Sequence, residues 1–285
     1  MNIAFLNGSY LPLEEARISP LDRGFLFGDG IYEVVPSYGG KMVGFAPHIQ
    51  RMNDGLDAIG IKFDWSESDW GDLCNQLIKK NGSGNLGIYL HVTRGADSKR
   101  FHGFSENITP TVFAFAFEIA PAPVADKTLA KKFKVSSSKD LRWDRCQIKS
   151  TSLLGNVLHF QQGQDQGNDE TLLFNADNQL TEASSCNAYI VKDSVVITPP
   201  LDNQLLPGIT RQILLDILRN DGSIKVEERP VSMHEVKNAD EVWITSSSKE
   251  IGAVVEIDGL PVGNGEVGDI WLAAQTLYSA AKHNY

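Results

Sequence analysis

One lysine stands where a side-chain amine could act as a nucleophile. Lys149 lies in the segment Gln147-Ile148-Lys149-Ser150-Thr151-Ser152, between an aliphatic residue and small hydroxyl residues that lead into an apolar helix face. A partly desolvated amine in such a place can attack the carbonyl carbon of an aldehyde. A solvated lysine at the start of a helix explains the same pattern, so the nucleophile hypothesis needs support from other segments.

A candidate anion site follows in Leu205-Leu206-Pro207-Gly208-Ile209-Thr210-Arg211, where proline and glycine shape a turn that opens into a helix. The free amides of a helix N-terminus, with a glycine and a hydroxyl side chain, suit a phosphate monoester. Thr245-Ser246-Ser247-Ser248 could add donors to the same anion. A plain helix cap and a polar turn are the alternatives for these two segments.

Glu182 lies among small residues in Leu180-Thr181-Glu182-Ala183-Ser184-Ser185-Cys186-Asn187, just before a predicted strand. A carboxylate buried there needs a partner, and a pyridinium nitrogen would serve, because the acid keeps it protonated and electron-withdrawing. An exposed glutamate at a strand edge is the alternative.

The N-terminal half contributes a glycine-dense, aromatic segment, residues 21–34, in which Gly24, Gly28 and Gly30 permit close backbone approach and Tyr32 offers a phenol. Arg51, on a predicted helix, is a fixed cation able to grip a phosphate in a bidentate way. A glycine-rich turn beside a surface arginine would look the same.

Composition narrows the function classes. With 26 basic and 36 acidic residues, the chain of 285 residues has a formal charge of -10, which repels nucleic acid and favours small-molecule ligands. No run of apolar residues reaches the length of a membrane span, so we expect no membrane partner and a cytoplasmic protein. Three widely spaced cysteines and six unclustered histidines predict neither disulfides nor a metal site.

The pattern along the chain predicts an α+β protein of two domains, residues 1–119 and 126–285, joined by the proline-punctuated linker 120–125. Alternating residues predict strands at 88–93 and 112–117. Strand-like runs predict further strands at 188–191 and 195–198, on either side of a turn, and at 241–245 and 254–257. Apolar residues at helical spacing predict helices around residues 49–59, 70–78, 153–158, 213–218 and 270–278.

Taken in order, these segments resemble the branched-chain and D-amino-acid aminotransferase family, the fold type IV pyridoxal-phosphate enzymes. The resemblance spans nearly the whole chain. It is carried by Asp22-Arg23-Gly24, Phe27 to Glu33, Arg51, Lys149, Glu182 with Asn187, and Gly208 to Arg211. It implies a two-domain fold type IV architecture, a homodimer and pyridoxal 5′-phosphate held as a Schiff base on Lys149. It further implies Glu182 at the ring nitrogen, Leu206 against the ring, and phosphate bound by Arg51, Ile209 and Thr210 with Ser246 or Ser247.

Within that family, Val92-Thr93-Arg94-Gly95 followed by Arg100-Phe101-His102 is similar to D-amino-acid transaminase. The similarity implies that Tyr32, Arg100 and His102 bind the substrate α-carboxylate, although the segment from Gly95 to Arg100 is one residue longer and Phe101 replaces a smaller residue. The implied reaction moves an amino group from a D-amino acid to a 2-oxo acid, with Lys149 as general base and acid. A branched-chain L-amino-acid or (R)-amine transaminase, an aminodeoxychorismate lyase and a non-catalytic phosphate-ligand binding protein are the alternatives.

Overall fold

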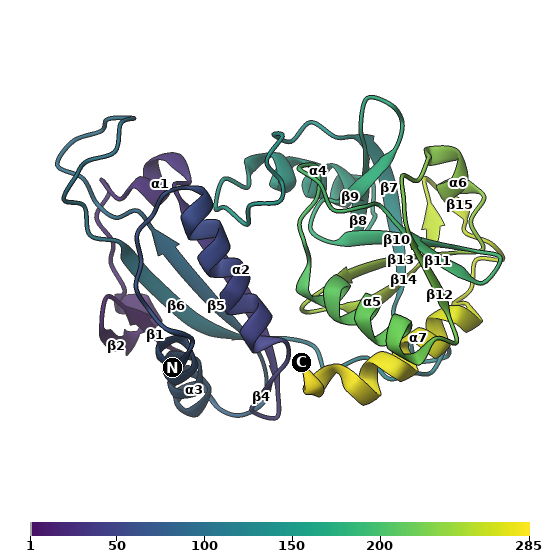
Figure 1. Cartoon of the computed structure of the whole chain (residues 1–285), viewed down its shortest axis with the longest axis horizontal. Coiled ribbons are helices and arrows are strands. Elements are labelled where there is room, and N and C mark those ends of the chain that lie inside the picture. Colours follow the sequence, from purple (N-terminus) through teal and green to yellow (C-terminus); the bar gives the residue numbers. More distant parts are fainter. Residues whose placement is uncertain (1) are drawn as a thin grey trace. The chain divides into compact units, whose positions relative to one another are not determined.

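The computed structural model describes residues 2–285, and it divides into two compact units (Figure 1). The N-terminal unit comprises residues 1–121 together with Ile148–Leu153 and Tyr285, and the C-terminal unit comprises Ala122–Gln147 and Leu154–Asn284. The division after Pro121 lies within the segment predicted as a linker. The short excursion that returns Ile148–Leu153 to the N-terminal unit, with Lys149 in it, has no counterpart in the sequence pattern.

The N-terminal unit is built on a six-stranded antiparallel sheet in the order β2-β1-β6-β5-β3-β4. Its strands are β1 (Ile3–Leu6), β2 (Ser9–Pro12), β3 (Gly30–Tyr38), β4 (Lys41–Met42), β5 (Asn85–Thr93) and β6 (Thr111–Glu118). Its helices are η1 (Leu13–Glu15), α1 (Arg23–Phe27), α2 (Phe45–Ala58) and α3 (Glu67–Asn81).

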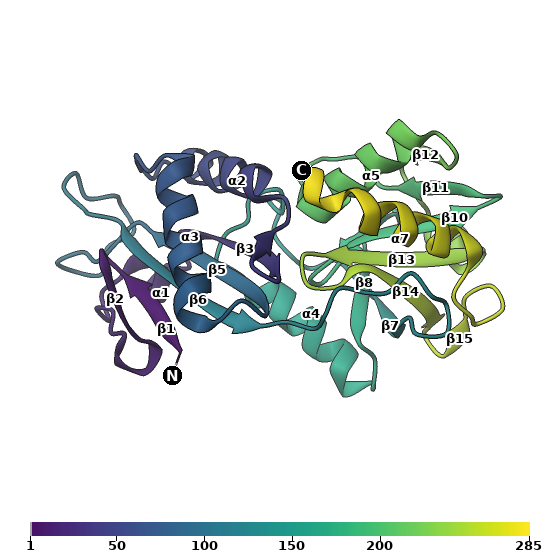
Figure 2. The same ribbon diagram turned by 90° about the horizontal axis from the view of Figure 1, so that it is seen from below.

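Helices α2 and α3 cover one face of this sheet, as Figures 1 and 2 show. Their apolar faces meet the inward residues of β3, β5 and β6 in one core that includes Ile31, Met52, Leu77, Ile88 and Ala114. The predicted helical spacing is confirmed here, because each helix buries the residues that recur at three and four positions. The opposite face of the sheet carries the aromatic residues of the same strands.

The C-terminal unit contains a nine-stranded mixed sheet in the order β12-β11-β10-β13-β14-β7-β8-β9, with β15 paired to β14. The strands are β7 (Lys132–Lys139), β8 (Glu170–Phe174), β9 (Leu180–Ala183), β10 (Asn187–Lys192), β11 (Val195–Thr198), β12 (Lys225–Glu228), β13 (Glu241–Ser246), β14 (Glu250–Ile257) and β15 (Leu260–Pro261). The helices are α4 (Leu154–Asp165), α5 (Ile209–Asp221), α6 (Met233–Lys237), α7 (Asp269–Ala281) and η2 (Lys282–Asn284).

Helices α5 and α7 lie side by side against β13, and α4 packs against β7 and β8 (Figures 1 and 2). The predicted apolar face of α5 is buried through Ile213, Leu214, Ile217 and Leu218. On α4 the outcome differs, because its apolar residues Leu154, Val157 and Leu158 are exposed in the single chain while His159 and Gly163 are buried.

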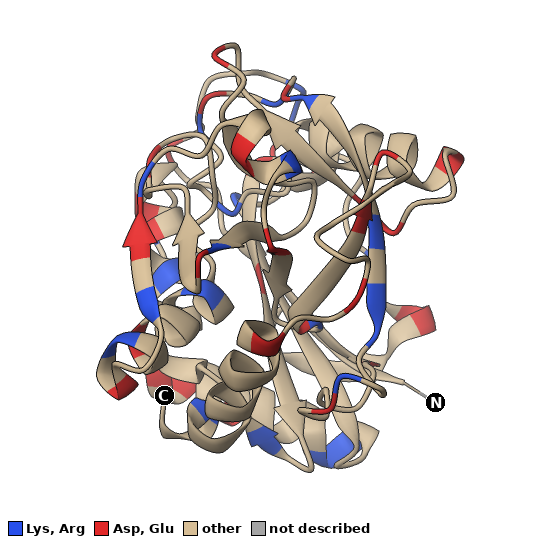
Figure 3. Ribbon diagram, turned by 90° about the vertical axis from the view of Figure 1, so that its right-hand side faces the viewer, with Lys and Arg blue, Asp and Glu red and all other residues tan. Residues whose placement is uncertain are grey.

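The chain is 29% helix and 31% strand, so the predicted α+β class is confirmed. Acidic and basic residues are interspersed along the C-terminal unit, as seen in Figure 3. Among residues 2–285, none of the helices has the length and apolar character that a membrane crossing requires.

Candidate active site

The lysine segment is tied to strand β3 by backbone hydrogen bonds. The Tyr32 amide donates to the Lys149 carbonyl at 3.1 Å, and the Thr151 amide donates to the Gly30 carbonyl at 2.9 Å. Gly28 allows this approach, because its φ of 67° lies in the left-handed region and a Cβ there would meet Ser152 Oγ at 2.5 Å. Close approach at Gly28 therefore serves the protein's own lysine segment.

The Lys149 amine lies over an aromatic ring. Its Nζ atom is 4.1 Å from the centre of the Tyr32 ring, a cation–π distance. Tyr32 in turn stacks on Tyr89 at 5.7 Å between ring centres, and Tyr89 contacts Phe115 at 5.1 Å. Two residues predicted to act in the reaction, Lys149 and Tyr32, are thus adjacent, and an aromatic ladder across β3, β5 and β6 supports them.

Arg51 has a partner that the sequence pattern does not predict. Its Nε and Nη2 atoms each donate to the Glu33 carboxylate at 2.7 Å, and His48 Nδ1 lies 2.7 Å from the same carboxylate. Glu33 is 0% exposed. Burial alone would raise the pKa of Glu33, but Arg51 and His48 outweigh it and hold that pKa far below its ordinary value. The phosphate contact predicted for Arg51 remains a prediction.

Arg100 and His102 lie in the exposed loop that follows β5. The Arg100 guanidinium and the His102 ring both contact the ring of Phe27, at 5.2 Å in each case. The two residues predicted to form the carboxylate trap are therefore brought to one aromatic side chain on α1. Their contact with a substrate remains a prediction.

Glu182 in the C-terminal unit is a buried carboxylate with several donors. Arg142 Nη1 donates to Glu182 Oε1, while Asn187 Nδ2 and the Leu206 amide donate to Oε2 at 3.1 and 3.2 Å. Burial raises the pKa of Glu182 to about 7, although Arg142 lowers it. Burial outweighs Arg142 here. The Asp140 carboxylate, which accepts from Arg142 Nε and Nη2 at 3.0 and 2.8 Å, adds a negative charge that also raises the pKa of Glu182.

Asn187 contacts or lies next to several of the predicted cofactor residues of this unit. Its Nδ2 also donates to the Leu206 carbonyl at 2.8 Å, and its backbone pairs with Thr245 next to Ser246. A Cβ on Gly208, the residue that precedes α5, would lie 2.0 Å from Asn187 Oδ1, so only glycine fits there. Glu182, Leu206, the start of α5 and the end of β13 thus meet around one side chain.

The donors at the start of α5 and the end of β13 suit an anion. The first amides of an α-helix, here those of Ile209 and Thr210, have no acceptor inside the helix. Ser246 Oγ is buried beside the Cys186 thiol and makes no hydrogen bond of ordinary geometry among residues 2–285. Ser247, half-buried, follows in the same turn. An acid, the apolar side chain of Leu206 and unpaired donors are the groups that a pyridine ring with a phosphate arm requires.

Three side chains at the Arg51 and Glu182 clusters, Glu33, Asp140 and Arg142, were not predicted from the sequence. Arg142 and Asp140 are recognisable only once β7 and β9 are neighbours of β8, because Arg142 and Glu182 are 40 residues apart. Glu33 lies in the glycine-rich motif, but only the alternation along β3, which turns Glu33 toward α2 and Tyr32 away from it, could have pointed to its pairing with Arg51.

Comparison with known proteins identifies the family of the chain. The profile of the class IV aminotransferases matches residues 30–257. A D-alanine aminotransferase from Staphylococcus haemolyticus is 36% identical over 271 residues, covering 95% of this chain and 94% of the relative. One from Bacillus licheniformis is 36% identical over 276 residues, covering 97% and 95%.

Solved structures show the same fold. The branched-chain amino acid aminotransferase of Escherichia coli superposes with a TM-score of 0.89 at 21% identity, covering 99% of this chain and 94% of the other. The branched-chain aminotransferase of the thermophilic archaeon Thermoproteus uzoniensis, solved with norvaline, gives 0.86 at 22% identity, covering 99% and 95%. From the extent of the profile match and the identity to full-length relatives, the chain belongs to the class IV aminotransferase family, whose enzymes are pyridoxal-phosphate-dependent transaminases.

Proposed function

We propose that this aminotransferase moves an amino group from a D-amino acid, with D-alanine as the first donor to test, to a 2-oxo acid. The observation that carries the proposal is the 36% identity to D-alanine aminotransferases over 95–97% of the chain. Tyr32 next to Lys149, and Arg100 with His102 on one loop, supply the residues that this substrate class requires.

The proposed cofactor is pyridoxal 5′-phosphate, attached to Lys149. When bound, it supplies the electron sink that transamination needs. Glu182 would hold the ring nitrogen and keep it protonated, and Leu206 would pack on the ring. Arg51, Ile209, Thr210, Ser246 and Ser247 would bind the phosphate; of these, Ser246 Oγ offers a buried hydroxyl without an ordinary partner among the described residues.

In this proposal Lys149 Nζ takes the proton from the substrate α-carbon and later returns one, as general base and acid. The Tyr32 ring fixes the position of Nζ at 4.1 Å. Tyr32, Arg100 and His102 bind the α-carboxylate and so decide which enantiomer presents its α-proton to Lys149.

The direct test is a donor assay. Incubation of the purified protein with D-alanine and 2-oxoglutarate should yield pyruvate, and L-alanine should not react. Equal turnover of both enantiomers, or of L-alanine alone, contradicts the proposed substrate. Lys149→Ala should lose at least about 100-fold in rate, whereas Lys131→Ala, at an exposed lysine of the C-terminal unit, should leave the rate unchanged.

We further propose a homodimer in the cytoplasm. The support for a second copy is the exposed apolar set on α4 and the segment before it: Leu141, Trp143, Leu154, Val157 and Leu158. Contiguous exposed apolar residues of this kind mark interaction surfaces. Three free cysteines support a reducing compartment.

Sedimentation velocity should give twice the chain mass of 31.3 kDa. Val157→Lys together with Leu158→Lys should shift the mass toward one copy. A wild-type monomer with full activity contradicts the dimer, and cell fractionation tests the compartment.

A further inference from the structure

One buried arginine holds the backbone of the loop that carries Arg100 and His102. Arg23, at the start of α1, is 3% exposed. Its Nη1 donates to the carbonyls of Phe101 at 2.6 Å and Gly103 at 3.2 Å, and its Nη2 donates to the carbonyl of His102 at 3.2 Å. Three consecutive carbonyls of an otherwise irregular loop thus converge on a single guanidinium.

An ion pair with Asp29 holds the Arg23 guanidinium in place. Arg23 Nε donates to Asp29 Oδ2 at 2.8 Å, and Arg94 holds the same carboxylate through two further hydrogen bonds of 2.8 and 3.0 Å. Asp22, the N-cap of α1, accepts hydrogen bonds from the Gly24 amide and from Thr111 Oγ1. Both the backbone at Arg23 and its counter-ion Asp29 are therefore held in place by hydrogen bonds to β6 and to Arg94.

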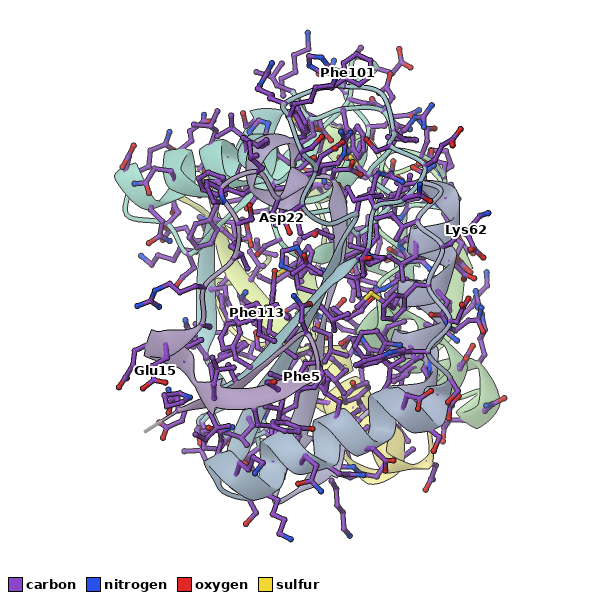
Figure 4. The ribbon with its side chains drawn as sticks, turned by 90° about the vertical axis from the view of Figure 1, so that its left-hand side faces the viewer. Phe5, Glu15, Asp22, Lys62, Phe101 and Phe113 are labelled. Carbon is purple, nitrogen blue, oxygen red and sulfur yellow. The ribbon has the colours of Figure 1, made fainter. Side chains whose placement is uncertain are left out.

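Aromatic contacts complete the clamp. Phe27, one helical turn after Arg23, carries the His102 ring and the Arg100 guanidinium on its own ring. Arg94 lies 3.6 Å from the centre of the Phe104 ring, in the same loop. In Figure 4, Phe101 lies near the edge of the molecule, beyond Asp22, although the carbonyl of Phe101 is bound by a buried side chain.

We propose that Arg23 is the positioning residue for carboxylate recognition: by binding the carbonyls of residues 101–103 it presets the directions of Arg100 and His102. This inference rests on the proposed function, in which those two side chains bind the substrate carboxylate. A loop ordered in advance avoids the conformational entropy that a mobile loop loses on binding. Removing the clamp therefore weakens substrate binding and leaves the proton transfer by Lys149 intact.

The test compares Arg23→Lys with Arg17→Lys. Lysine keeps the charge but cannot bind a carboxylate and three carbonyls at once. Arg17 is a matched control, because its exposed guanidinium also binds two backbone carbonyls of the same unit. In the holoenzyme, Arg23→Lys should raise the KM for D-alanine about tenfold with kcat within about twofold, and Arg17→Lys should change neither.

A double-mutant cycle separates positioning from general loss of structure. In a background of Arg100→Ala with His102→Ala, the Arg23→Lys substitution should raise KM no further, because its target is already gone. A fall in kcat with KM unchanged, or additive effects in the cycle, overturns the proposal.

Trypsin supplies a readout that needs no turnover. Lys99 and Arg100 are cleavage sites in the exposed loop, and Arg23→Lys should speed cleavage there while Arg17→Lys does not. Should Arg23→Lys fail to fold, Phe27→Leu loosens the same loop from its other contact and takes its place. Lack of D-amino-acid turnover by the wild type overturns the proposed function, whereas unchanged cleavage in the Arg23 and Phe27 variants overturns the clamp.

Discussion

Two buried glutamates, one in each unit, each bind an arginine, yet their pKa values are shifted in opposite directions. Glu33 binds Arg51 and His48, and its pKa is lowered; Glu182 binds Arg142, and its pKa is raised to about 7. The difference lies in the charges around each acid. Arg51 and His48 both lower the pKa of Glu33, whereas Glu182 has, among the described residues, Arg142 alone as a cationic partner and also feels the negative charge of Asp140. The pKa of a buried carboxylate therefore depends on the balance between burial and the charges beside it. Glu182, the acid with fewer cationic partners, is the one proposed to meet a further cation, the pyridinium.

The largest effect should come from removing the shared cation. Arg142→Met leaves the buried Glu182 and the part-buried Asp140 without the guanidinium that both bind, and breaking a buried pair in this way costs about 3–5 kcal/mol. Urea denaturation of the cofactor-free protein measures the loss. A loss below about 1 kcal/mol would show that the guanidinium contributes no more than a surface ion does.

Arg51→Met should cost less, about 2–3 kcal/mol, because His48 remains at 2.7 Å from Glu33 and can take up a proton. Burial lowers the pKa of His48, and Arg51 lowers it further, so removing Arg51 favours the imidazolium. Part of the lost stability should therefore return below neutral pH in Arg51→Met but not in Arg142→Met. Equal pH profiles of the two variants would remove the proposed role of His48.

Gly208→Ala tests the close contact between Gly208 and Asn187, the residue that binds Glu182 and Leu206. The added Cβ would lie 2.0 Å from Asn187 Oδ1, so Asn187 must move away from Glu182 and Leu206. We expect a loss of about 1–3 kcal/mol in unfolding free energy together with weaker binding of pyridoxal phosphate. Gly84→Ala, where a Cβ meets open space, should stay within about 0.5 kcal/mol of the wild type.

A further effect is a difference in pH dependence between the two acids. Glu33 has a lowered folded pKa, so its contribution to stability is present above its ordinary value of 4.5 and is lost as the pH falls below that value. Glu182 has a raised folded pKa, so its contribution is present below 4.5 and is lost as the pH rises toward 7.

The free energy of unfolding should be measured across the acidic and neutral pH range for the cofactor-free wild type, Glu33→Gln and Glu182→Gln. The slopes against pH then test the two expected signs. The advantage of the wild type over Glu33→Gln should grow as the pH rises through 4.5, and its advantage over Glu182→Gln should shrink between 4.5 and about 7. Two slopes of the same sign would contradict the comparison.

The parts of the fold that follow a period were predictable from the sequence. Helices α2, α3 and α5 have apolar residues that recur every three and four positions, and β5 and β6 alternate. Strands β10 and β11 are strand-like runs on either side of a turn, so each of these elements is where the pattern places it. Strand β3 was not predicted, because its glycine and proline conceal the alternation. On α4 the apolar spacing is present, yet it faces outward in the single chain.

Individual site residues could be predicted from their type and their neighbours in the sequence, but their long-range contacts could not. Lys149 and Glu182 were found from their small and apolar neighbours in the sequence. Their contacts were not predicted, because Tyr32 is 117 residues from Lys149 and Arg142 is 40 residues from Glu182, and only strand pairing brings them together. Tyr32 was named as a site residue, whereas Arg142 was not. The arginine at position 23 likewise meets residues 101–103 through its fold and not through any sequence motif.

The central claim is that Lys149 carries the cofactor, and borohydride reduction tests it most directly. The holoenzyme should be reduced, digested and mapped by mass spectrometry, with Lys149→Ala treated in parallel. We predict a pyridoxyl-phosphate label on the peptide that contains Lys149, and none on any lysine of the variant. A label on another lysine of the wild type, or no label at all, would contradict the claim.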